Sequence, residues 1–167
     1  MKYFHLKGIH PAIGFYNPFK RWNKKDIRFT AEFNDSCKYN IGTRDQKDWN
    51  KLFGVDFTPL TPANSPTSVM VAWRYYNSTF QLGLYAHTEE FPVILPSKVI
   101  SSQVGKFTGV LTLTKGFPGV LLEANGEVTG AVEWKFLNST SKGRIINPWF
   151  GGSKTPPHNM NFNLKFQ

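Results

Sequence analysis

The sequence predicts an all-β protein, an antiparallel β-sandwich with one short helix and an extended N-terminal arm. Its 167 residues are 40% hydrophobic and 16% aromatic, which supplies enough apolar material for one folded domain. Thirteen Asn and 13 Thr against only seven Ala disfavour helices and favour strands joined by turns. Several segments also alternate apolar and polar residues, the period of a half-buried strand.

Residues 1–25 are expected to form the arm. They interleave six Lys or Arg with aromatic residues and contain no acid. Pro11, Gly14 and Pro18 interrupt any regular element, so the segment should lie extended against the domain or against a partner. The chain is therefore divided into an arm at 1–25 and a β-sandwich domain at 26–167. The arm residues expected to bind a partner are Phe19, Lys20, Arg21, Trp22, Lys24 and Lys25.

The domain is expected to begin with a strand. Alternate residues from Ile27 to Phe33 are apolar, with Arg28, Thr30 and Glu32 between them. Residues 45–53 suit one helical turn, with Asp45 as the cap and Gly54 as the stop. Residues 58–67 contain three prolines and are expected to be a loop.

Hairpins and a closing strand account for most of the remaining chain. Residues 68–76 and 79–87 flank Asn77-Ser78, and residues 120–124 and 128–136 flank Asn125-Gly126, a strong hairpin signal. Between them, residues 106–115 alternate regularly. Residues 93–100 contain Pro96 and are expected to be an edge strand or loop. The last predicted strand alternates from 160 to 166. Regular strands and turns of this kind indicate a sandwich or barrel.

Charge and cysteine content limit the classes of partner and compartment. The formal net charge is +9 and the sequence pI is about 9.7, which favours anionic partners such as nucleic acid, acidic protein or glycan. The single Cys37 cannot form an internal disulfide, so a reducing compartment is permitted. The N-terminus lacks the features of a classical secretion signal, and no window suits a membrane span. A cytoplasmic or virion location is expected, with no membrane partner.

The sequence leaves open whether the protein is an enzyme, and its residue patterns favour a protein without catalytic activity. Glu123, Glu127 and Glu133 flank the Asn125 hairpin and are candidates for a glycosidase carboxylate pair, but solvated positions explain them more simply. The four histidines have no metal-ligand spacing, and no phosphate-binding loop is present. No metal or cofactor is therefore expected.

A possible ligand surface comprises Trp73, Arg74, Tyr75 and Tyr85. Aromatic rings stack on sugars and on bases, and Arg74 among them suits an anionic ligand. Packing of the same aromatic side chains in the core is the alternative explanation.

The C-terminal region carries a resemblance to a known family. Asn147-Pro-Trp-Phe-Gly-Gly152, followed by Thr155-Pro-Pro-His-Asn159 and a final alternating strand, is similar to the "PYFGG…APH" ending of an uncharacterised family of bacterial and phage-associated β-sandwich proteins. Asp48-Trp-Asn-Lys-Leu-Phe-Gly54, Ala72-Trp-Arg74 and Leu82-Gly-Leu-Tyr85 occur in that family's order, so the resemblance spans about residues 30–167. Trp149 stands where Tyr is usual. The resemblance implies a concanavalin-like or jelly-roll sandwich and no established activity.

The sequence therefore predicts a non-catalytic β-sandwich protein that acts by binding or assembly. The leading hypothesis is a virion-type structural or decoration component, docking through its basic arm onto a protein assembly or as a homo-oligomer. One alternative is a lectin-like module or glycan-cleaving enzyme that uses the aromatic residues and the carboxylates of the Asn125 hairpin. Another is an intracellular sponge for anionic nucleotides, suggested by Arg74 and the cationic excess.

Overall fold

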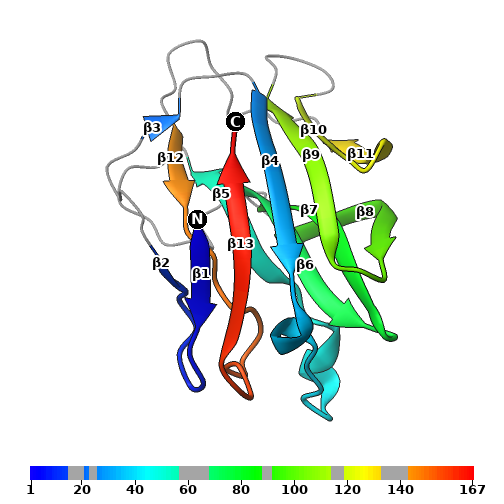
Figure 1. The fold of residues 1–167 in the computed structure, drawn as a ribbon. Coiled ribbons are helices and arrows are strands. Elements are labelled where there is room, and N and C mark those ends of the chain that lie inside the picture. The colour runs from blue at the N-terminus through cyan, green and yellow to red at the C-terminus, as the bar shows by residue number, and fades with distance from the viewer. Residues whose placement is uncertain (15–20, 23–25, 57–67, 88–91, 114–118, 133–142) are drawn as a thin grey trace.

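The computed structural model is an antiparallel β-sandwich (Figure 1). It describes residues 1–14, 21–22, 26–56, 68–87, 92–113, 119–132 and 143–167. Within this part of the chain, one sheet has seven strands in the order β11-β10-β9-β4-β13-β1-β2, and the other has six in the order β3-β12-β5-β6-β7-β8. The predicted all-β sandwich is confirmed.

The strands of the seven-stranded sheet come from both ends of the sequence and from its middle. They are β1 (Lys2–His5), β2 (Ile13–Gly14), β4 (Asp26–Phe33), β9 (Lys106–Leu113), β10 (Val120–Ala124), β11 (Glu127–Val132) and β13 (Met160–Phe166). The C-terminal β13 lies between β4 and the N-terminal β1. Alternation in β4 and β13 places every second side chain in the core, as the sequence predicts.

The six-stranded sheet is built around a long central hairpin. Its strands are β3 (Arg21–Trp22), β5 (Asn50–Asp56), β6 (Ser68–Tyr76), β7 (Thr79–His87), β8 (Pro92–Ser102) and β12 (Gly143–Ile146). The predicted hairpin around Asn77-Ser78 is confirmed as β6–β7. The segment around Pro96, predicted to be an edge strand or loop, is the edge strand β8.

Aromatic side chains hold the two sheets together. Phe33 of β4 stacks on Trp73 of β6 with ring centroids 4.4 Å apart, and Phe29 meets Phe53 of β5 at 4.9 Å. All four residues are at most 4% exposed. Each fully buried Phe contributes about 2 kcal/mol of transfer free energy, so this aromatic layer is a main source of the stability of the sandwich.

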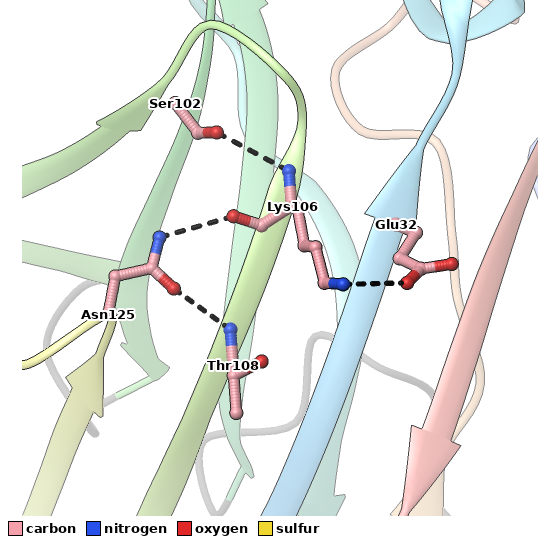
Figure 2. Close-up of polar contacts among 5 residues, drawn as sticks. All are labelled: Glu32, Ser102, Lys106, Thr108 and Asn125. Carbon is pink, nitrogen blue, oxygen red and sulfur yellow. Dashed lines mark hydrogen bonds and ion pairs between the residues drawn. The ribbon is translucent and has the colours of Figure 1, made fainter.

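The Asn125-Gly126 turn shows how one residue fixes a hairpin against its neighbour (Figure 2). Asn125 has a φ of 52°, and its side chain continues the ladder along β9: Oδ1 accepts from the Thr108 amide at 2.9 Å, and Nδ2 donates to the Lys106 carbonyl at 3.1 Å. Lys106 also pairs with Glu32 of β4 at 3.5 Å. The tip of the β10–β11 hairpin is therefore pinned to β9.

The predicted helical turn differs from the structure. The single helical turn expected at residues 45–53 is a short 3₁₀ turn, Arg44–Lys47, and residues from Asn50 onward form β5. Leu52 and Phe53 are buried in the core as strand residues, and a bulge between Lys51 and Phe53 disturbs the two-residue period. A second 3₁₀ turn, Asp35–Cys37, follows β4.

The described parts of the predicted arm are extended, and they belong to the sandwich. β1 pairs with β13, β2 with β1, and β3 with β12. Tyr3 and His5 are buried at 3% and 0% exposure. At least residues 2–5 therefore complete the core of the domain that was predicted to begin at residue 26. No helix in the described part of the chain is long and apolar enough to span a membrane.

Candidate functional site

The most distinctive surface of the described residues is an apolar patch at the N-terminal strands. Tyr3 and His5 point into the core, so alternation along β1 turns Phe4 outward. Phe4 is directly opposite Ile13 of β2 in the register, and paired residues share one face of a sheet. Phe4, Ile9, Ile13 and Trp149, all between 38% and 55% exposed, are together called the N-terminal patch.

Trp149 reaches this patch because residues 148–150 join the edges of the two sheets. Trp149 forms isolated bridges to Pro11 on one side and to Lys51 of β5 on the other. The Trp149 amide donates to the Lys51 carbonyl at 2.9 Å, and the Lys51 amide donates back at 2.8 Å. The His10 ring stacks on the Trp149 ring at 5.6 Å and 11°, so the two rings form one surface.

The residues around Trp149 explain the Pro-Trp-Phe-Gly-Gly sequence in structural terms. Phe150 is buried between Tyr39 and His5, with ring centroids at 5.3 and 5.9 Å. A Cβ on Gly151 would collide with the backbone carbonyl of Trp49, so only glycine fits there. The motif therefore closes the sandwich and leaves the Trp149 ring partly exposed.

Cationic side chains border the patch. Lys2 and Lys7 are exposed, and the Lys2 Nζ lies 5.3 Å from the centre of the Phe4 ring. Lys51, opposite Trp149, has its Nζ 5.2 Å from the Tyr85 ring, and burial lowers the pKa of this amine. The patch thus combines aromatic and aliphatic side chains, with the Lys2 amine directly beside Phe4.

The predicted partner-binding residues of the arm fall mainly outside this description. Phe19, Lys20, Lys24 and Lys25 lie outside the described residues. For Arg21 and Trp22 the structure describes the backbone, which pairs with Arg144 and Gly143 of β12.

The four residues of the predicted ligand surface do not come together on one face. Trp73 is fully buried in the core, where it stacks on Phe33, and Tyr75 leans inward against Phe80. Arg74 and Tyr85 point to the opposite, outer face of the six-stranded sheet. Trp73 is therefore a core residue, and the prediction that it belongs to a ligand surface is wrong.

Arg74 is held by the protein itself. Its Nε donates to Gln81 Oε1 and its Nη1 to the Lys47 carbonyl, both at 2.7 Å. The guanidinium lies 4.3 Å from the Trp49 ring and 4.8 Å from the Tyr76 ring. Burial lowers the pKa of Arg74, which is nevertheless far too basic to lose its proton at neutral pH. Arg74 thus holds Trp49 against the sheet and uses two of its five N–H donors within the protein.

The candidate reactive groups are placed unfavourably for catalysis. The hairpin register sets Glu123 opposite Val128 and Glu127 opposite Ala124, so these two carboxylates do not face each other. Glu133 lies outside the described residues. Burial raises the pKa of Cys37 to about 12, and its Sγ lies 3.1 Å from the Asn161 carbonyl, so the thiol stays protonated and unreactive at neutral pH. Among the described residues, no three His, Cys, Asp or Glu side chains gather as metal ligands.

Comparison with known proteins adds no assignment, since no family model and no curated protein matches the chain. The similarity of the C-terminal sequence to a bacterial and phage-associated family therefore stays a prediction.

Sequence reasoning missed the patch as a site. It noted Phe4 only as one of several aromatic residues in a basic segment and Trp149 only as part of the C-terminal motif. The available signal was the Tyr3-Phe4-His5 alternation, because a strand that buries Tyr3 and His5 must expose Phe4. The contact between Trp149 and residues 10–11 joins positions about 140 apart in sequence, and no local pattern indicates it.

Proposed function

We propose that this protein is a non-catalytic component of a protein assembly and that it docks on an acidic partner protein through the N-terminal patch. One observation carries the proposal. Of the seven large hydrophobic side chains that are exposed among the described residues, four belong to residues 1–14, and a fifth, Trp149, stacks on His10 of the same segment. Single exposed apolar side chains are ordinary, whereas their concentration on one face is typical of an interaction surface.

Charge identifies the kind of partner. The chain carries a net charge of +9, the Lys2 Nζ lies 5.3 Å from the centre of the Phe4 ring, and Lys7 is exposed in the segment between Phe4 and Ile9. An interface with an aromatic centre and a cationic border favours a partner that offers apolar side chains surrounded by Asp and Glu. Long-range attraction to such a surface speeds association, and salt weakens it.

More specifically, the hypothesis is that this protein is a structural or decoration component of a virion-type assembly. A basic N-terminal segment and a sandwich without disulfide cross-links suit a protein that attaches to a larger particle. The similarity of residues 147–159 to a phage-associated family points the same way.

A peptide display selection tests the docking proposal without a known partner. Random peptides are selected on the wild-type protein and measured against Phe4→Ser/Ile13→Ser. The matched control is Val104→Ser/Val128→Ser, which removes two exposed apolar side chains elsewhere. We expect acidic peptides with interspersed apolar residues, bound at least ten-fold more weakly by the patch variant and unchanged by the control.

Two results would overturn the proposal. The first is a selected pool without acidic character, or one that binds the patch variant as tightly as the wild type. The second comes from sedimentation velocity of the protein alone. If the wild type self-associates and Phe4→Ser/Ile13→Ser abolishes this, the patch binds a second copy of the chain and not an acidic partner.

A further inference from the structure

A cavity at one end of the six-stranded sheet forms a second candidate site, which shares no residue with the N-terminal patch. It is open to solvent and has a volume of about 280 Å³ where β6 turns into β7, beside the loop that follows the Asp35–Cys37 turn. Its lining comprises Tyr39, Asn40, Gln46, Tyr75, Tyr76, Asn77 and Ser78. Every one of these side chains is uncharged at neutral pH.

Hydrogen bonds hold the aromatic wall of the cavity in place. Tyr39 is 4% exposed, and its hydroxyl accepts from Asn50 Nδ2 at 3.0 Å. The side-chain Nε2 of Gln46 donates to the backbone carbonyls of Tyr75 at 2.8 Å and Tyr39 at 3.2 Å. Its Oε1 accepts from the backbone N–H of Ile41 at 2.7 Å. Gln46 therefore ties the loop to the end of β6, which fixes the Tyr39 and Tyr75 rings at a centroid distance of 6.4 Å.

The opposite wall carries polar groups that are free for a ligand. Asn77 and Ser78 are exposed at the tip of the hairpin, and within the described chain their side chains form no hydrogen bond. The Asn40 side chain uses its oxygen for the Gly42 amide at 2.9 Å, which leaves its NH₂ group available. These groups offer both donors and acceptors at the rim of an aromatic cavity.

The backbone at this rim is strained. Asn77 and Ser78 have φ values of 49° and 59°. Asn tolerates this left-handed region and Gly adopts it freely, but Ser pays about 1 kcal/mol or more there. A two-residue hairpin turn requires positive φ at both central positions, and here a serine, in place of the usual glycine, takes this strain and lines the cavity with its hydroxyl.

The chemistry of the lining defines the ligand. Aromatic rings pack against the apolar face of a sugar, while amides and hydroxyls exchange hydrogen bonds with its hydroxyl groups. Among the described residues that line the cavity there is no Lys or Arg to attract a phosphate or carboxylate. The volume lies near the lower limit of about 300–1,000 Å³ for small-molecule sites, which suits a single ring. We propose that this cavity binds one pyranose ring of a neutral glycan.

The test uses saturation-transfer NMR on the full chain with a panel of neutral oligosaccharides, an acidic glycosaminoglycan fragment and free nucleosides. The key variant is Asn77→Gly/Ser78→Gly, which removes both rim side chains and suits the turn. Ser101→Ala, an exposed serine on β8, is the matched control. We expect at least one neutral oligosaccharide to bind independently of salt. The rim variant should bind this oligosaccharide about ten-fold more weakly, because it loses two hydrogen bonds of modest strength. The control variant should bind it with the same affinity as the wild type.

Several outcomes would overturn the proposal. One is the absence of saturation transfer to every neutral oligosaccharide at millimolar concentration. Others are binding that the rim variant leaves intact, or a panel in which only the acidic fragment or a nucleoside binds. Thermal unfolding of the rim variant separates ligand contacts from folding, because relief of strain should keep its melting temperature at or above that of the wild type.

Discussion

His5 makes the stability of this protein depend on pH in a defined range. The imidazole is fully buried on β1, between the rings of Phe150 and Phe162, and among the described residues neither ring nitrogen has a hydrogen-bond partner. Burial lowers the pKa of His5 from 6.5 to about 4; the nearby His10 backbone opposes this shift and the His10 charge adds to it. Neutral His5 is therefore strongly favoured in the folded state.

The magnitude follows from linkage. Because the folded state binds the proton less tightly than the unfolded state, stability is complete above pH 6.5 and falls as the pH drops toward 4. The full difference in pKa, about 2.5, corresponds to about 3 kcal/mol at 1.36 kcal/mol per pKa unit. About 2 kcal/mol of this should already be lost at pH 5.

Urea unfolding measured from pH 7.5 to 4.5 tests this prediction, because urea is uncharged and leaves the electrostatics intact. His5→Phe keeps an aromatic ring between Phe150 and Phe162 but cannot titrate. Between pH 7.5 and 5, the decrease in its free energy of unfolding should therefore be about 2 kcal/mol smaller than the decrease in the wild type. Tyr3→Phe, on the same strand, is the control: burial raises the pKa of Tyr3, so its removal should leave the acid dependence unchanged. The reasoning is refuted if His5→Phe and the wild type lose equal stability.

Three further predictions concern packing and reactivity. Gly151→Ala should lower the free energy of unfolding by at least about 2 kcal/mol in urea titrations, because its Cβ meets the Trp49 carbonyl; a cost below 0.5 kcal/mol would contradict that contact. Trp73→Ala should cost about 3–5 kcal/mol as a core residue, whereas Tyr85→Ala on the outer face should cost much less, and equal costs would argue against their opposite orientations. Cys37 should react with a thiol reagent at pH 8 only after unfolding, so rapid modification of the native protein would show that its thiol is neither buried nor high in pKa.

Local periodicity was sufficient to predict much of the fold. A strand with one face in the core must alternate, and β4, β7 and β13 do so clearly enough for their buried residues to be read from the sequence. The turns at Asn77-Ser78 and Asn125-Gly126 both begin with Asn, which tolerates positive φ, and both hairpins form there. These features depend on neighbours within about ten residues, which is why sequence reasoning could reach them.

The remaining features depend on distant parts of the chain. The predicted arm contributes β1 because its partner is β13, and four residues of alternation are too few to predict such a pairing. Trp73 could not be assigned to core or surface from composition, since a ring that stacks on Phe33 looks the same in sequence as one that stacks on a ligand. The cavity joins residues 39–46 to residues 75–78 through Gln46, a contact without any local signature.

The position of β13 between β4 and β1 also affects how the chain is made. β4 ends at residue 33 and its neighbour β13 begins at residue 160, so all the residues between them must be synthesised before these two strands can pair. Until then, nascent β1 and β4 have no β13 to pair with and are open to contacts with other chains. This long-range pairing should therefore be a slow step of folding. The α-amino group of Met1 donates to the Leu164 carbonyl at 2.9 Å, so a short linker between the termini should allow circular permutants that bring β13 and β1 together early in translation.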